Sequence, residues 1–260
     1  MGRSALFVDA GFLLAWGAAR IAGAGAPRLA VGCDYPRVVQ LLWGACVPQA
    51  GPSSDLLRIY WYDGAPDQMA TPEQVTIGNL DNVKLRLGRL TPAGQKGVDT
   101  LIVLDLTTLA REKAIDTAFL LSGDDDLREA VIVAQHSGVR VVLLGLANIG
   151  GTRQSKDLIR EADRIVDVTA VVEPCFTHVV TPPYLDGQAF SQALFAATPA
   201  MLPGLTQLKA SGARLVIPQP DEQLLKAQVK QALKQRGWRR ADLDPWHMQE
   251  ARRAFWDLVP

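Results

Sequence analysis

The sequence predicts an α/β fold: a parallel sheet flanked by helices, followed by a small, mostly helical C-terminal extension. Short apolar segments alternate along the chain with segments whose apolar residues recur at helical spacing. Such alternation is typical of a parallel sheet with helices on both faces. The alternation stops near residue 172. We therefore expect one α/β domain over residues 1–172 and a linker with a partly helical accessory region over residues 173–260.

Each element of the first domain has a local signature. Strands are short and apolar, or alternate apolar with basic residues, whereas helices show apolar residues three or four apart. In chain order we expect a strand over 6–8, a helix over 12–21, a loop over 23–32, a helix over 35–47, strands over 56–62 and 83–90, a helix over 100–110 capped by Asp99, a strand from Thr117, a helix over 127–138, a strand over 139–144, a helix over 155–162 and a short strand over 164–168.

The C-terminal region begins with a Pro-rich stretch, residues 173–183, and is expected to form helices over 221–237 and 246–258. Residues 226–240 are basic and contain no acid. Arg236, Trp238 and Arg239 are candidates for nucleic-acid binding, because arginines pair with phosphates and tryptophan stacks on bases. The alternative is a solvated amphipathic helix that Trp238 anchors to the core.

Charge balance, cysteine spacing and hydropathy argue against a strongly basic, a disulfide-rich and a membrane protein. Basic and acidic residues number 27 each in a chain of 260, so the formal net charge is zero and no global field attracts a polyanion. Any nucleic-acid partner must meet a local basic patch. The three cysteines are far apart in sequence and lack metal-ligand spacing, which favours a reduced, cytoplasmic protein. Asp9 interrupts the apolar N-terminal run, which argues against a signal peptide, and no partnership with a membrane is expected.

The most informative motif joins an apolar run to three consecutive carboxylates. Residues 117–121 are apolar, Ser122 and Gly123 follow, and Asp124, Asp125 and Asp126 precede the next helix. One carboxylate suffices to cap a helix, and three repel one another. Oxygen-rich clusters of this kind suit hard divalent cations such as Mg²⁺ or Mn²⁺. The alternative is a helix cap with solvated charge beside it.

Carboxylates from distant positions converge if the sheet is parallel. Asp9 follows the first strand, Asp124 and Asp126 follow another, and Asp99 opens a helix. Because ligands bind at the carboxyl ends of parallel strands, these four side chains are expected at one edge of the sheet. Such convergence is what metal-assisted phosphodiester hydrolysis requires. Asp125 is expected to point away, with a helix-capping role open to it, because neighbours in an extended turn face opposite sides.

These residues resemble the NYN domains of the PIN-like nuclease superfamily. The matching pieces, within roughly residues 3–170, are residues 6–11, residues 96–99 running into 104–106, residues 121–127, and Ser155, Leu158, Ala162 and Asp163. The resemblance implies a Rossmann-like PIN fold and a divalent-metal-dependent ribonuclease whose products carry a 5′-phosphate and a 3′-hydroxyl. It implies that Asp9, Asp99, Asp124 and Asp126 are the catalytic metal ligands. The family usually has Asn where this chain has Phe12, which removes a polar group from the edge of the site.

Other polar residues are candidates for roles around this cluster. Lys96 is a candidate for stabilising negative charge on a phosphate, against a solvated lysine. Ser122 is a candidate substrate contact but no nucleophile, because no His is spaced to form a triad with it. Asp105 lies off the Asp99 face of its helix and is expected to support the site or to pair with a basic group. Asp63 is a weak candidate at the end of another strand.

The sequence therefore supports more than one function. The first is a Mg²⁺- or Mn²⁺-dependent ribonuclease with RNA as its partner. The second is a non-catalytic RNA-binding or scaffold protein of the same fold, which Phe12 favours. The third is a metal-dependent phosphatase, although the residue two after Asp9 is Gly11 rather than the expected acid. A homo-oligomer is compatible with all three.

Overall fold

The computed structural model describes residues 2–24, 26, 28–51, 54–66, 69–91, 94–149 and 153–178, and beyond these only isolated positions between 206 and 227. The chain divides into two compact units, Met1–His178 and Val179–Pro260. The first unit carries the architecture that follows. The helices expected over 221–237 and 246–258, together with Arg236, Trp238 and Arg239, lie outside the described residues.

The predicted parallel sheet is confirmed. Six parallel strands and one antiparallel edge strand, β5, form a sheet in the order β5-β4-β3-β1-β6-β7-β8. The strands are β1 (Gly2–Asp9), β3 (Ser54–Pro66), β4 (Val83–Thr91), β5 (Gly94–Lys96), β6 (Thr117–Leu121), β7 (Arg140–Gly145) and β8 (Arg164–Asp167). Strand β6 is buried at every position, as expected for a parallel strand covered on both faces.

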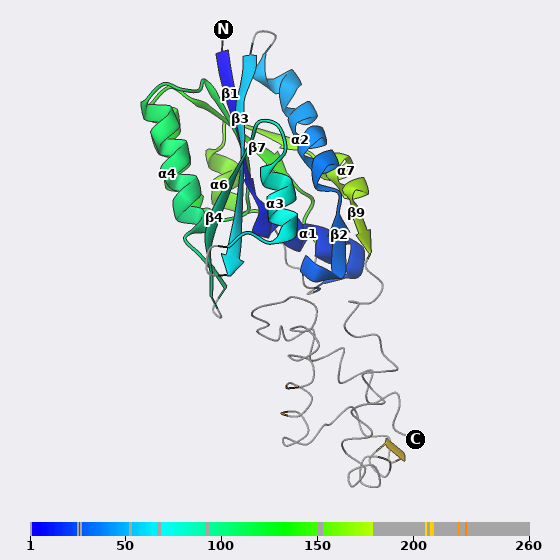
Figure 1. The fold of residues 1–260 in the computed structure, drawn as a ribbon. Helices are drawn as coiled ribbons and strands as arrows, with labels where there is room; N and C mark the ends of the chain where they lie inside the picture. Colours follow the sequence, from blue (N-terminus) through cyan, green and yellow to red (C-terminus); the bar gives the residue numbers. More distant parts are fainter. Residues whose placement is uncertain are drawn as a thin grey trace. The chain divides into compact units, whose positions relative to one another are not determined.

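Helices cover both faces of the sheet (Figure 1). They are α1 (Ala10–Ala22), α2 (Tyr35–Ala50), α3 (Pro72–Gly78), α4 (Val98–Arg111), α5 (Arg128–His136), α6 (Lys156–Glu161) and α7 (Thr169–Val172), with 3₁₀ turns η1 (Arg28–Ala30), η2 (Asp125–Leu127) and η3 (Glu173–Cys175). Successive residues of a strand point to opposite faces. Accordingly Leu6 and Val8 of β1 join the core under α1 and α2, whereas Ala5 and Phe7 join the core under α4 and α5.

The strand order reverses between β1 and β6. The chain runs from β1 outward to β3 and β4, then crosses through α4 to β6 and continues to β7 and β8 on the other side. In open α/β sheets this reversal opens a crevice at the carboxyl ends of the strands, where ligands bind. Asp9 ends β1, and the acidic turn follows β6, so these candidate residues lie at the ends of the two strands between which the order reverses.

A second, two-stranded sheet was not expected. Strands β2 (Val31–Cys33) and β9 (Phe176–His178) pair antiparallel. Glu173–His178, expected to begin the linker, instead forms η3 and β9 within the first unit, because Cys175 and Phe176 are buried there. Part of the expected loop over 23–32 likewise forms η1 and β2. Among the described residues, no helix has the length and apolar character needed to cross a bilayer.

Candidate active site

Asp9 lies at the end of β1 with only 8% of its surface exposed. It caps α1, since its Oδ1 accepts a hydrogen bond from the backbone N–H of Phe12 at 3.1 Å. Its Oδ2 accepts a hydrogen bond from the Ser122 hydroxyl at 2.9 Å. Burial raises the pKa of Asp9; the hydrogen bonds from Phe12 and Ser122 oppose this effect, and the negative charge of Asp99 adds to it. Asp9 is therefore a buried carboxylate held in a fixed orientation beside a second acid.

The acidic turn after β6 is built on Ser122. This side chain is fully buried, and its Oγ accepts a hydrogen bond from the backbone N–H of Asp124 at 3.3 Å while donating to Asp9. Asp124 in turn caps η2, because its Oδ1 accepts a hydrogen bond from the N–H of Asp126 at 3.1 Å. Ser122 thus joins the two acidic segments. The sequence predicts a substrate contact for Ser122. Because the side chain is buried, it is better suited to positioning Asp9.

Asp125 points away from the other acids, toward the start of α6. Its Oδ1 accepts a hydrogen bond from the Ser155 hydroxyl at 2.5 Å, and the Ser155 N–H donates to the carbonyl of Gly123 at 3.0 Å. Ser155 also caps α6. The helix cap at the acidic turn comes from Asp124 rather than from Asp125. The turn is thereby tied to the segment that follows β7.

A buried glutamine further fixes the turn. Gln154 is 5% exposed and donates hydrogen bonds to the carbonyls of Ser122 at 2.8 Å and Leu144 at 3.0 Å. Its Oε1 accepts a hydrogen bond from the N–H of Leu146 at 3.1 Å. These bonds join the ends of β6 and β7. No local sequence signal marks Gln154, because its role depends on backbone groups of two distant segments.

Asp99 lies in the first turn of α4. The prediction that it caps this helix is wrong: Gly97, in the left-handed region at φ 82°, occupies the cap position, and the helix begins at the buried Val98, two residues earlier than expected. Burial raises the pKa of Asp99, and the charges of Asp124 and Asp126 raise it further. The charge of Asp99 also raises the pKa of Asp9, so the four predicted carboxylates form one electrostatically connected group.

This group fits a hard divalent cation in chemistry, because all its donors are carboxylate oxygens and the charges of neighbouring acids raise the pKa of Asp9 and Asp99. A cation among them would remove that repulsion. The arrangement is open, however. Within the part of the chain that the structure describes, no three His, Cys, Asp or Glu side chains lie close enough to share one ion. Asp9, Asp99, Asp124 and Asp126 are thus near enough to interact electrostatically, but they do not form a closed metal shell.

The remaining candidates have other partners or lie elsewhere. Lys96 is the last residue of β5, but its side chain lies outside the described part of the structure. Asp105 pairs with a basic group, as one of its two expected roles required: it accepts hydrogen bonds from Arg86 at 2.9 Å and 2.6 Å, and one from the Tyr62 hydroxyl at 3.0 Å.

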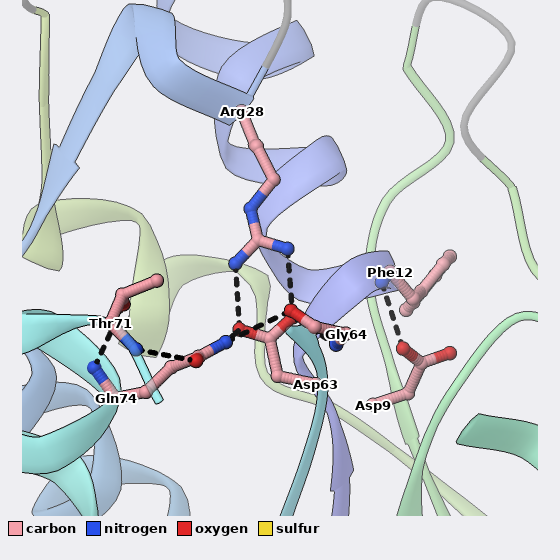
Figure 2. A network of polar contacts seen from close by, with 7 residues as sticks. All are labelled: Asp9, Phe12, Arg28, Asp63, Gly64, Thr71 and Gln74. Carbon is pink, nitrogen blue, oxygen red and sulfur yellow. Dashed lines mark hydrogen bonds and ion pairs between the residues drawn. The ribbon is translucent and has the colours of Figure 1, made fainter. Parts of the chain in front are cut away.

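Asp63 belongs to a polar network that joins η1, β3 and α3 (Figure 2). Arg28 of η1 binds both of its oxygens, with Nη1–Oδ1 at 2.8 Å and Nη2–Oδ2 at 2.9 Å. Gln74 of α3 donates to Oδ2 at 2.7 Å, and the Gly64 N–H donates to Oδ1 at 2.8 Å. Figure 2 shows the network beside Asp9 and Phe12.

Phe12 packs directly on the acidic turn. A methyl group built at Gly123 would lie 2.5 Å from Cε2 of the Phe12 ring and 3.0 Å from the carbonyl oxygen of Arg153. A side chain at position 123 therefore requires the Phe12 ring or the turn to shift. The ring is half-buried. The edge of the site is apolar at this position.

The fold and the site define a class: a Rossmann-like α/β domain whose carboxylates gather where the strand order reverses, as in PIN-like proteins. The sequence profile of the NYN domain family matches residues 25–169, more than half of the chain, and the chain belongs to this family of the PIN-like nuclease superfamily. The match includes Asp99, Asp124 and Asp126 and begins after Asp9.

One relative is the uncharacterized protein y4oD of Sinorhizobium fredii (strain NBRC 101917 / NGR234), 42% identical over 122 residues, or 43% of this chain and 57% of that protein. The chain thus spans little more than half the length of this relative. Among solved structures, a protein of unknown function from Vibrio parahaemolyticus RIMD 2210633 is similar with a TM-score of 0.46 and 21% identity, covering 66% of this chain and 95% of that one.

Proposed function

We propose that this protein is a divalent-metal-dependent ribonuclease that hydrolyses RNA phosphodiester bonds. The observation that carries the proposal is the electrostatic connection among Asp9, Asp99, Asp124 and Asp126, which come from three separate segments to the crevice between β1 and β6. Membership of the NYN family supports the same activity. A cluster of carboxylates that destabilise one another is expected where a cation is to be bound.

The roles of the residues follow from their environments. Mg²⁺ or Mn²⁺, when bound, would supply a water of lowered pKa and positive charge opposite the phosphate oxygens. Asp9 is the rigid member of the ligand set, because Phe12 and Ser122 fix both of its oxygens. Asp126 is exposed and Asp99 and Asp124 are partly exposed, so these carboxylates face the side from which a substrate arrives. Lys96 remains a candidate for stabilising negative charge on the phosphate.

The test is cleavage of a labelled mixed-sequence RNA with Mn²⁺, with Mg²⁺ or with EDTA, run beside Asp124→Asn. We expect cleavage that needs the metal. The rate should fall at least about 100-fold in the variant, the usual effect of removing one group that stabilises transition-state charge. Circular dichroism of the variant checks that the fold is intact. An Asp124→Asn protein that cleaves as fast as the wild type would refute this assignment.

A second function is favoured by two observations: the apolar Phe12 on the acidic turn, and the open arrangement of the described carboxylates. In this alternative the protein binds RNA without cutting it. The variant Asp99→Asn/Asp126→Asn separates the two functions. A nuclease loses activity in this variant, whereas a binding protein retains RNA or binds it more tightly, because less negative charge faces the phosphates.

A further inference from the structure

We propose that Arg28 contacts a backbone phosphate of the nucleic acid bound at the candidate active site, and that Asp63 and Gln74 orient it for this contact. The inference rests on the proposed function and adds to it a cationic contact, on the β3 side of Asp9. The residues come from η1, from the end of β3 and from α3.

The electrostatics of the site favour a cationic group beside the carboxylates. Four carboxylates at the crevice repel a phosphodiester, and the chain has no net positive charge to compensate. Arg28 lies close enough to Asp9 for the two charges to interact. Burial acts to lower the pKa of the guanidinium, but its hydrogen bonds and charge interaction with Asp63, together with the charges of Tyr35 and Asp9, raise it overall. Arg28 is thus a permanent cation beside the most buried acid of the cluster.

The geometry holds the guanidinium in one orientation. Both oxygens of Asp63 bind it in a two-pronged pair, and the Asp63 side chain is only 2% exposed whereas that of Arg28 is 36% exposed. A guanidinium carries five N–H groups in a rigid plane, and these two bonds use one from each terminal nitrogen. The pair therefore directs one edge of the guanidinium inward. The accessible part of the side chain offers donors in the fork geometry that matches phosphate oxygens.

The support beneath this pair is itself rigid. Gln74 donates to Asp63 at 2.7 Å and to the Gly64 carbonyl at 3.0 Å. Its backbone N–H and side-chain oxygen complete a capping box with Thr71 at the start of α3. Asp63 is therefore held in place to orient Arg28, at the end of the strand next to β1.

The chain offers a matched control for the test. Arg86 and Asp105 form the same kind of two-pronged pair, with exposures of 38% and 11%, against the core on the opposite face of the sheet. Replacing either pair, as Arg28→Met/Asp63→Asn or Arg86→Met/Asp105→Asn, removes one cation and one carboxylate without leaving a buried charge unpaired. Both variants keep the net charge of the protein, so a difference between them reports the position of the arginine.

The measurement is the affinity for a fluorescein-labelled mixed-sequence single-stranded RNA at several salt concentrations, with EDTA present to prevent cleavage. Each phosphate contact contributes about 0.7 to the slope of log affinity against log salt. We expect Arg28→Met/Asp63→Asn to lose about that much slope and to bind more weakly, whereas Arg86→Met/Asp105→Asn keeps the wild-type slope. Equal slopes in all three proteins would overturn the proposal.

A second measurement uses the wild-type protein and so does not depend on the folding of a variant. Phenylglyoxal modifies accessible arginines, and Arg28 and Arg86 are almost equally exposed. Bound RNA should protect Arg28 and leave Arg86 reactive, as read by mass spectrometry of peptides. Equal protection of both would refute the contact. If wild-type protein cleaves RNA but the slope and protection are unchanged, this inference alone fails; if it neither binds nor cleaves RNA, the proposed function fails and the inference with it.

Discussion

The hydroxyl of Ser122 donates a hydrogen bond of 2.9 Å to Asp9, although 113 residues separate the two in sequence. The same oxygen accepts a hydrogen bond from the backbone of Asp124. Ser122 therefore connects the carboxylate at the end of β1 with the acidic turn after β6. Because both side chains are buried, the bond persists only while the ends of these two neighbouring strands stay in register.

Ser122→Ala is expected to lower metal-dependent cleavage by roughly 10- to 100-fold, the usual cost of losing a group that orients a metal ligand. The hydrogen bond from Ser122 lowers the pKa of Asp9, so its loss should move the acidic limb of the pH–rate profile to higher pH. Initial rates across pH and Mn²⁺ concentration measure both effects. Ser137→Ala, which removes a hydroxyl bound to the Val133 carbonyl at the end of α5, is the control. An unshifted acidic limb would contradict the orienting role.

Asp99→Asn is expected to stabilise the metal-free protein at pH 7. The pKa of Asp99 is raised above its ordinary 3.8 by burial and by the charges of Asp124 and Asp126, so its ionised form is less favourable in the folded than in the unfolded state. The resulting loss of stability is present above the folded pKa and disappears as pH falls below 3.8, where both states are protonated. The stability gained by Asp99→Asn should therefore decrease as the pH is lowered from 7 to 3.8.

Thermal unfolding at several pH values, with EDTA or with Mn²⁺, tests this expectation. Addition of Mn²⁺ should stabilise the wild type more than Asp99→Asn, because the metal binds the folded state and needs the carboxylate. Asp55→Asn, at an exposed position near the start of β3, provides the control. A variant that melts below the wild type in EDTA at pH 7 would show that Asp99 stabilises the fold rather than preparing a cation site.

The parallel sheet and most of its helices could be predicted, because each long element carries its own periodicity. Elements that form only by pairing with segments distant in sequence could not be predicted. Strand β2 has three residues and pairs with β9, which follows Pro174, so neither shows a local strand signal. Helix α3 was missed although Thr71 and Gln74 have the spacing of a capping box, a signal that could have revealed it.

Some residues of the candidate site could likewise be predicted from the sequence, and others could not. Asp9, Asp99, Asp124 and Asp126 stand directly after strands or at a helix start, and the rule for parallel sheets brings such positions together. That rule does not predict the residues that support these carboxylates. Gln154 bonds backbone groups of two segments, and Arg28 meets Asp63 only because η1 folds over the end of β3. Sequence periodicity predicts where strands end, but not which polar side chain a distant loop places against them.

Gln154→Leu is expected to destabilise the protein by at least about 2 kcal/mol, because it removes three hydrogen bonds to buried backbone groups, each costing about 1–3 kcal/mol and not fully additive. Gln135→Leu is the control. Gln135 makes a side-chain hydrogen bond to the Glu161 carbonyl from a partly buried position, so about 1 kcal/mol is expected. Urea denaturation measures both variants. Equal midpoints would mean that Gln154 does not hold the acidic turn.

Gly123→Ala tests the contact between Phe12 and the acidic turn. The added methyl would meet the Phe12 ring at 2.5 Å and the Arg153 carbonyl at 3.0 Å, so we expect a loss of about 1–3 kcal/mol, typical of overpacking, and reduced cleavage as the turn shifts. Gly44→Ala in α2 meets nothing within 4 Å and should stabilise the helix by about 0.5–1 kcal/mol.

Phe12→Ala removes the nearer of these two obstacles. In a double-mutant cycle, Gly123→Ala should therefore cost less in the Phe12→Ala background than in the wild type, although the Arg153 carbonyl still limits the space. The free energies of unfolding of the four proteins give the coupling directly. Strictly additive effects would mean that the ring does not rest on Gly123. The apolar edge would then play no part in fixing the turn that carries Asp124 and Asp126.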